Sequence, residues 1–120
     1  MPNDPVIEIQ PHEDVLLVVV QKRSLDEAST RALVEEVLFA TTKRPAVPVV
    51  LDMDRVKFAP SVALGSLVQL HRDLLLDGRR VALIHLDRRV REVLRVTQLD
   101  KFLEIHSSIE RVLAAPPKRS

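Results

Sequence analysis

A chain of 120 residues is long enough for one compact domain with a single core and too short for two. Hydrophobic residues make up 46% and charged residues 29%, which is typical of a globular chain rather than a disordered one. The formal net charge is +1 without any basic block, and there are three Phe but no Trp or Tyr. We therefore expect no direct contact with nucleic acid, which favours clustered positive charge or flat rings for base stacking.

The absence of cysteine excludes disulfides, thiolate catalysis and cysteine-based metal sites. No apolar stretch approaches the roughly 18–20 residues that span a bilayer. Residues 1–10 lack the basic segment and apolar run of a signal peptide, so we expect no membrane span and a cytoplasmic location. Basic pairs such as Arg79-Arg80 stand at the ends of apolar runs, and we expect them at solvated edges of the fold.

The first third of the chain predicts two strands and a helix. Residues 6–9 alternate as a short strand, and residues 15–20 form a β-branched run that we expect to be buried on both faces. Together they predict an opening hairpin. After Ser24 the apolar residues recur at helical spacing, and Ser24 or Asp26 is expected to cap this helix.

The middle third predicts a buried strand over residues 47–53, a loop over 54–59 and a long helix. Pro60 opens an apolar-periodic segment that reaches Leu76. Proline is favourable in a first helical turn because its missing N–H would be unpaired there. Asp77-Gly78 is expected to end the helix, with the glycine in the left-handed conformation.

The last third continues the alternation. Residues 81–86 predict a third buried strand, Asp87 is expected to cap a short helix, and residues 102–105 predict a brief strand. Ser107-Ser108 starts a final helix. The resulting order, β-β-α-β-α-β-α-β-α, favours an α/β fold with a mixed, mostly parallel sheet of about four to five strands and about four helices.

The domain organisation follows from the ends of the chain. Residues 1–5 and 115–120 are punctuated by proline and charge, so we expect them to be loose ends. Residues 6–114 between them contain neither an internal repeat nor a linker, and we expect them to form a single domain.

Conventional catalytic and cofactor-binding signatures are missing. The only glycines are Gly65 and Gly78, so neither a dinucleotide fingerprint nor a phosphate-cradling loop can form. The four histidines lie in four different predicted elements and no pair has the i, i+4 spacing of a helical metal site. We expect neither a metal nor a cofactor. Ser61 also lies outside any G-x-S-x-G motif, which disfavours a serine hydrolase.

Asp52 and Asp54 stand at the end of the strand predicted over residues 47–53. Two carboxylates two residues apart on a strand point to the same face, and at the carboxyl edge of a parallel sheet they could line a polar site. They could equally be a solvated strand end that prevents edge pairing. We favour the second interpretation on these residues alone.

Ser61 lies in the first turn of the helix that Pro60 opens. A phosphate group there would meet free backbone N–H groups and the positive end of the helix dipole. It would add a charge near −2 to an otherwise apolar neighbourhood and could switch a docking surface off without refolding the domain. The alternative is an ordinary helix-start serine chosen for local hydrogen bonding, and spacing alone favours that alternative.

The central region of the STAS family is similar to residues 49–86, VVLDMDRVKFAPSVALGSLVQLHRDLLLDGRRVALIHL. In that family a buried strand ends in Asp, and a short loop leads to an Asp-Ser-(Ser/Thr)-Gly-Leu stretch that opens a helix. Residues 90–114, VREVLRVTQLDKFLEIHSSIERVLA, look like the family's closing region. The resemblance covers nearly the whole chain, from about residue 6 to residue 114, and implies a STAS fold.

The resemblance also implies a function. Ser61 falls on the position that a partner kinase phosphorylates in the anti-sigma-factor antagonists of this family. The unmodified domain would bind an anti-sigma factor, which is often itself a Ser kinase, and release its sigma factor; phosphorylation would end that binding. The chain would then be a ligand and a substrate, not an enzyme.

Two departures from the family pattern flank Ser61. Pro60 stands where the family has Asp, and Val62-Ala63 replace the usual Ser/Thr-Gly, whereas Leu64 and Gly65 fit the pattern. The missing carboxylate weakens the local recognition signal for a kinase.

We expect the partner to bind the loop and helix start, with Val62 and Leu70 as exposed apolar anchors. The expected contact residues are Phe58, Pro60, Ser61, Val62, Leu64, Gly65, Ser66, Gln69 and Leu70. Two alternatives stay open. One is a phosphorylation-independent STAS scaffold, or soluble partner subunit, of a stress-signalling complex or transporter. The other is a small hydrolase or nucleotide-binding enzyme that uses Asp52, Asp54 and Ser61.

Overall fold

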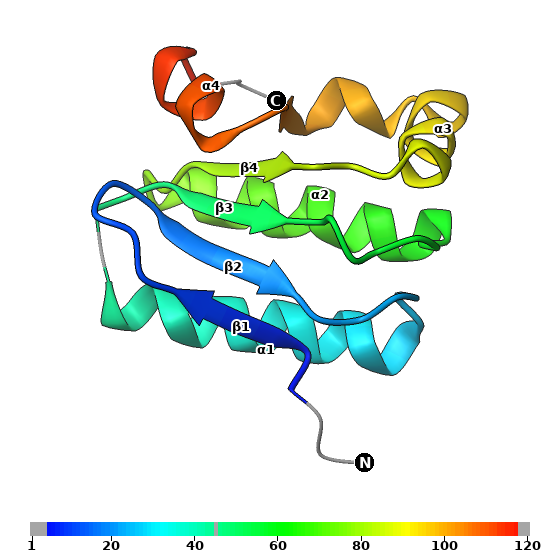
Figure 1. Ribbon diagram of the computed structural model, residues 1–120, viewed down its shortest axis with the longest axis horizontal. Helices are drawn as coiled ribbons and strands as arrows, with labels where there is room; N and C mark the ends of the chain where they lie inside the picture. The colour runs from blue at the N-terminus through cyan, green and yellow to red at the C-terminus, as the bar shows by residue number, and fades with distance from the viewer. Residues whose placement is uncertain (1–4, 45, 118–120) are drawn as a thin grey trace.

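The computed structural model describes residues 5–44 and 46–117 and contains one five-stranded sheet (Figure 1). Its strands lie in the order β1 (Ile7–Gln10), β2 (Leu16–Val20), β3 (Val49–Asp52), β4 (Val81–Ile84) and β5 (Glu104–His106). The strand β1 pairs with β2 in antiparallel fashion, and the other three pairings are parallel. A helix connects the two strands of each parallel pair, as parallel neighbours require, and a fourth helix follows β5. The predicted α/β fold, with a mixed, mostly parallel sheet and four helices, is therefore confirmed.

The elements follow one another in the predicted order, with one short 3-10 helix, η1, inserted before the last strand. Their bounds are β1 Ile7–Gln10, β2 Leu16–Val20, α1 Glu27–Lys43, β3 Val49–Asp52, α2 Ser61–Leu76, β4 Val81–Ile84, α3 Arg88–Thr97, η1 Leu99–Phe102, β5 Glu104–His106 and α4 Ile109–Ala114. Of the predicted loose ends, residues 1–4 and 118–120 lie outside the described residues.

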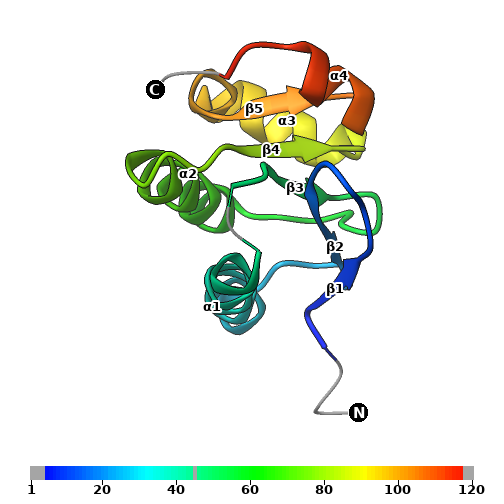
Figure 2. The same ribbon diagram turned by 90° about the vertical axis from the view of Figure 1, so that its left-hand side faces the viewer.

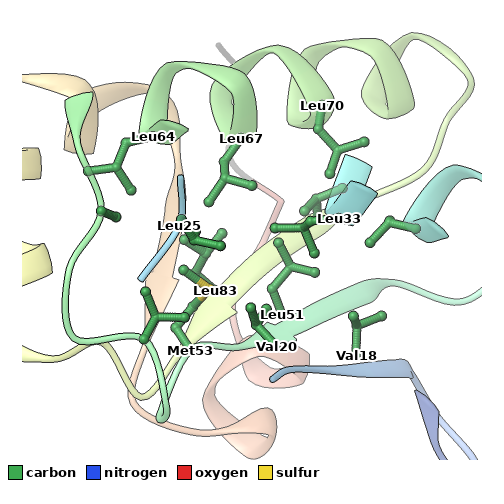
Figure 3. Packing of buried hydrophobic residues seen from close by; sticks show 14 of the residues in the cluster. Val18, Val20, Leu25, Leu33, Leu51, Met53, Leu64, Leu67, Leu70 and Leu83 are labelled. Atoms are coloured by element: carbon green, nitrogen blue, oxygen red, sulfur yellow. The ribbon is translucent and has the colours of Figure 1, made fainter. Parts of the chain in front are cut away.

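The helices form two layers on the sheet. Figure 2 shows α1 and α2 side by side on one face and α4 on the opposite face. The larger core lies between the sheet and the helices α1, α2 and α3, and Figure 3 shows leucines of α2 pointing toward β2, β3 and β4. A smaller cluster joins Val112 and Ile109 of α4 to the other face of the sheet. The core is almost entirely aliphatic, as the scarcity of aromatic residues requires.

The predicted strands were too long or began too early. The strands predicted over residues 47–53 and 81–86 extend only over Val49–Asp52 and Val81–Ile84. His85 ends β4 because its φ of 59° is incompatible with an extended strand. The strand predicted over 102–105 begins at Glu104, since Leu99–Phe102 form η1.

The pair Arg79-Arg80 does not lie at a solvated edge. The Arg79 side chain is buried and donates hydrogen bonds to the carbonyl oxygens of Val47 and Thr41. Burial lowers the pKa of Arg79 below its usual value, and the nearby charge of Arg44 lowers it further. Arg80 forms an ion pair with the buried Glu104. Both guanidinium groups therefore connect elements of the fold instead of facing water.

Candidate functional site

The loop from β3 to α2 is held against the segment that leads into α1. The amides of Lys57 and Phe58 both donate to the carbonyl oxygen of Arg23, at 2.8 and 3.1 Å, and the amide of Leu25 donates to the carbonyl oxygen of Phe58 at 3.0 Å. Ser24 and Phe58 form an isolated parallel bridge. These contacts fix the position of the loop immediately before Ser61.

Ser61 is the first residue of α2 and is exposed. Pro60 is the N-cap residue, with φ −69° and ψ 161°, and its carbonyl oxygen accepts the amide of Leu64 at 3.1 Å. Proline has no side-chain acceptor, so no side chain in the described part of the chain caps this helix, and its first turn contains no acidic residue. The expected position of Ser61 in the first helical turn is confirmed.

The other three α-helices of the described residues have side-chain caps. Asp26 accepts from the amide of Ser29 at 2.7 Å, Asp87 from the amide of Arg89 at 2.9 Å, and Ser108 from the amide of Arg111 at 3.2 Å. The N-terminus of α2 therefore differs from the others in leaving its first-turn N–H groups without a side-chain acceptor. Such groups, together with the helix dipole, favour an anion.

A groove lies between α1 and α2 and reaches the start of α2. It encloses about 710 Å³ and is hereafter called the α1–α2 groove. It is lined by Leu25, Asp26, Glu27, Thr30, Arg31, Val34, Glu35, Pro60, Val62, Ala63, Ser66, Gln69, Leu70 and Asp73. Val62 stands at its edge with 78% of its surface exposed. Ser61 is not among the lining residues, so it lies beside the groove.

The residues expected to bind a partner divide into two groups. Pro60, Val62 and Gln69 are exposed and line the groove, Gly65 and Ser66 are half-buried, and Phe58 is 46% exposed in the preceding loop. Leu64 and Leu70 are instead part of the core, with 0% and 2% exposure. The expectation that Leu70 is an exposed anchor is therefore wrong, because α2 packs against α1, α3 and the sheet and so buries a wide arc of its surface (Figure 3).

Asp52 and Asp54 do not share a strand face as predicted. Asp52 ends β3, whereas Asp54 lies in the following turn and is exposed. The carboxylate of Asp52 accepts the amide of Asp54 at 3.0 Å, and the same oxygen lies 3.0 Å from Nδ1 of His85. Asp52 therefore terminates the strand. It pairs with His85, a contact that the sequence pattern did not predict.

The pair of Asp52 and His85 does not extend to Ser61. In the described part of the chain no hydrogen bond joins the Ser61 hydroxyl to either residue, so no nucleophile–base contact is formed. The register of the sheet explains the pair: Asp52 lies opposite Ile84, and His85 follows Ile84 directly. Only the register, which the sequence does not display, could have identified it.

Phe58 lies beneath two positive charges. The guanidinium groups of Arg23 and Arg89 lie 5.4 and 5.0 Å from the centre of its ring. Lys57 lies 3.6 Å from Asp87. Hydrogen bonds from the Arg89 side chain and amide, together with the charges of Arg89 and Lys57, lower the pKa of Asp87 to about 2. The two guanidinium groups over the ring and the ion pair between Lys57 and Asp87 together hold the exposed Phe58 ring in a defined place beside the start of α2.

Across residues 5–44 and 46–117, no three His, Cys, Asp or Glu side chains gather into a metal-binding group. None of the helices in these ranges combines the length and the apolar character needed to cross a bilayer.

Comparison with known families identifies the fold. The family model described as "STAS domain" matches residues 6–112. The match extends from the residue before β1 into α4, so it includes the whole sheet, the loop before Ser61 and the α1–α2 groove. The chain belongs to the STAS domain family.

Solved structures show the same architecture. An anti-sigma factor antagonist from Mycobacterium paratuberculosis is 21% identical, with 95% of each chain covered and a TM-score of 0.75. An anti-sigma-factor antagonist (STAS) domain protein from Planctomyces limnophilus is 24% identical, with coverage of 90% and 94% and a TM-score of 0.72. The anti-sigma factor antagonist SpoIIAA in its unphosphorylated form is 16% identical, with coverage of 92% and 98% and a TM-score of 0.69. At these identities the similarity defines the fold.

Proposed function

We propose that the chain is a non-enzymatic binding module of the anti-sigma-factor-antagonist type, and that phosphorylation of Ser61 ends its binding to a protein partner. The observation that carries the proposal is the N-terminus of α2. The first residue of this helix is the exposed Ser61, and the helix has neither a side-chain cap nor a carboxylate in its first turn. Membership of the STAS family and the similarity to structures described as anti-sigma factor antagonists support it.

The surroundings of Ser61 suit a docking surface. Val62 is one of the most exposed apolar side chains of the described residues, and exposed Pro60 and Gln69 lie near it along the groove. If a partner covers the Val62 side chain fully, the burial should contribute about 1.5 kcal/mol or more to the free energy of binding. The contact would also exclude water from the Ser61 hydroxyl.

Phosphorylation would oppose that contact without refolding the domain. The phosphate group carries a charge near −2, and covering it with a partner would strip its water at a large free-energy cost. In the free domain the same group would accept hydrogen bonds from the unpaired first-turn N–H groups of α2. The phosphoryl group would come from the nucleotide of a partner kinase, so the chain itself performs no catalysis.

The proposal is tested on protein purified from its native host, in growth and under stress. Trypsin would release the segment from Phe58 to Arg72, which contains both Ser61 and Ser66. We expect one phosphate on this peptide, assigned to Ser61 by fragmentation and absent from a Ser61→Ala variant. An unmodified peptide under both conditions would contradict the switch and favour a phosphorylation-independent scaffold.

A further inference from the structure

The α1–α2 groove has an apolar floor. Leu25, Ala63 and Leu70 are all at most 3% exposed and lie at its base, and Val34 is half-buried beside them. The hydroxyl of buried Thr30 donates a hydrogen bond to the carbonyl oxygen of Asp26 at 2.7 Å. This hydroxyl therefore needs no hydrogen bond from a ligand. The floor therefore holds no unmet polar group, and the exposed Val62 and half-buried Val34 provide the apolar surface that a ligand can cover.

The rim of the groove is acidic. Four carboxylates line it, from Asp26, Glu27, Glu35 and Asp73, against the single guanidinium of Arg31. Arg31 already pairs with Glu27 at 3.1 Å. The lining carries a net charge of −3 although the whole chain carries +1, so the negative charge is a local feature of this groove.

The shape of the groove selects a helix over an extended peptide. On α2 the lining runs from Val62 to Asp73, which corresponds to about 16 Å or three helical turns. The groove is walled by two helices and offers no sheet edge, so an extended peptide would leave its backbone N–H and C=O groups without partners. A helix satisfies its own backbone and packs between two neighbouring helices with apolar residues at i, i+3, i+4 and i+7.

From these three features we infer that the α1–α2 groove binds an amphipathic helix of a protein partner, with an apolar face for the floor and Lys or Arg residues for the acidic rim. The inference rests on the proposed function in taking the occupant to be a segment of the protein partner. It does not depend on the Ser61 switch, because Ser61 lies outside the lining. The groove anchors the partner, and Ser61, which lies beside the end of the groove at the start of α2, is the place where a phosphate would interfere.

The probe is a fluorescently labelled peptide of Leu and Lys, about five helical turns long and patterned as an amphipathic helix, with a Leu and Glu peptide of the same pattern as its counterpart. Binding to the whole chain is followed by anisotropy, and the methyl chemical shifts of Leu25, Val34 and Leu70 report the location. We expect the Leu/Lys peptide to bind, to shift these methyl signals and to weaken with added salt. The Leu/Glu peptide should not bind.

Charge reversal provides the matched comparison. The double variant Glu35→Lys, Asp73→Lys changes two exposed groups on the rim and should weaken peptide binding about tenfold or more. The control Glu110→Lys, Asp14→Lys changes the net charge equally at exposed positions away from the groove and should weaken it less than about threefold. Circular dichroism and urea unfolding of both variants verify that they are folded.

The other possible results either overturn the inference or separate it from the proposed switch at Ser61. Equal loss in both double variants, binding of the Leu/Glu peptide, or methyl shifts confined to other regions would overturn the inference. Ser61→Asp should not weaken binding of the Leu/Lys peptide, since Ser61 is outside the lining and the added negative charge stands beside an acidic rim. If the peptide binds as expected while Ser61 is never phosphorylated in the host, the proposed switch fails and the groove stands. If Ser61 is phosphorylated but the peptide does not bind, the groove inference fails alone.

Discussion

The amide of Leu25 donates a hydrogen bond to the carbonyl oxygen of Phe58 at 3.0 Å. Leu25 is fully buried just before α1, whereas Phe58 belongs to the loop that leads to Ser61. The bond connects the starts of the two helices that wall the α1–α2 groove. Because of it, the loop before Ser61 presents the serine in a fixed place on a rigid scaffold.

Amide hydrogen exchange should be slow in this loop and fast at the uncapped start of α2. We expect the amides of Leu25 and Phe58 to exchange slowly, because both are hydrogen-bonded to backbone carbonyls. The amides of Val62 and Ala63 should exchange much faster, since no side chain caps this helix, and should become protected in protein phosphorylated at Ser61. Slow exchange of Val62 and Ala63 in the unmodified protein would contradict the uncapped geometry.

The ion pair between Arg80 and Glu104 should contribute strongly to stability. Arg80 donates two hydrogen bonds to the carboxylate, at 2.8 and 2.6 Å, and the Glu104 side chain is only 2% exposed. Arg80→Met leaves that buried charge without its guanidinium partner and should lower the free energy of unfolding by about 3 kcal/mol or more. Urea unfolding measures the change. The control Arg95→Met breaks the exposed pair with Glu92 and should cost about 0.5 kcal/mol or less.

Two leucines of α2 should differ sharply in their effect on stability. Leu67 is fully buried in the core, whereas Leu76 is 87% exposed at the end of the same helix. Leu67→Ala should lower the free energy of unfolding by about 2–5 kcal/mol, because it removes buried methyl groups and leaves a cavity. Leu76→Ala should change it by about 0.5 kcal/mol or less in urea unfolding. Equal effects would contradict the orientation of α2 in Figure 3.

The N-cap of α3 should give a defined pH dependence. Hydrogen bonds from Arg89 lower the pKa of Asp87 to about 2, from the usual 3.8. A carboxylate with a depressed pKa in the folded state stabilises fully above the unfolded value, and this contribution disappears as the pH falls toward the folded value. The difference in unfolding free energy between wild type and Asp87→Asn should therefore shrink as the pH is lowered from about 4 to about 2.

A constant difference over that interval would show that the charge of Asp87 contributes nothing. The substitution retains an oxygen that can cap the helix, so it isolates the charge from the cap. Asp14→Asn, at an exposed position in the opening hairpin, is the control and should show a smaller pH dependence.

Local signals in the sequence predicted most of the fold. Asp26, one of the two caps expected for α1, and Asp87, the cap expected for α3, both cap their helices, and Gly78 follows the end of α2 with a φ of 74°. Each of these features depends on residues within one or two turns, so the printed order of residues is sufficient to predict them. The placement of Ser61 at a helix start follows in the same way from the proline before it.

Features that depend on register or on neighbouring helices could not be predicted. The contact between Asp52 and His85 requires the pairing of β3 with β4, and the contact between Arg80 and Glu104 joins the residue before β4 to the first residue of β5. The burial of Leu70 depends on α1, which packs against α2 and forms the other wall of the groove that Leu70 lines. The acidic rim of the groove likewise combines residues of two helices.

A phosphorylation switch at Ser61 is tested by comparing three tagged chains in the native host by affinity purification and quantitative mass spectrometry. These are the wild type, Ser61→Asp, and the control Ser107→Asp, which adds the same charge at an exposed serine before α4. We expect a partner that is recovered with the wild type and with Ser107→Asp but lost, by about tenfold or more, with Ser61→Asp. Recovery of the same partners in equal amounts with all three chains would contradict a phosphorylation switch at Ser61.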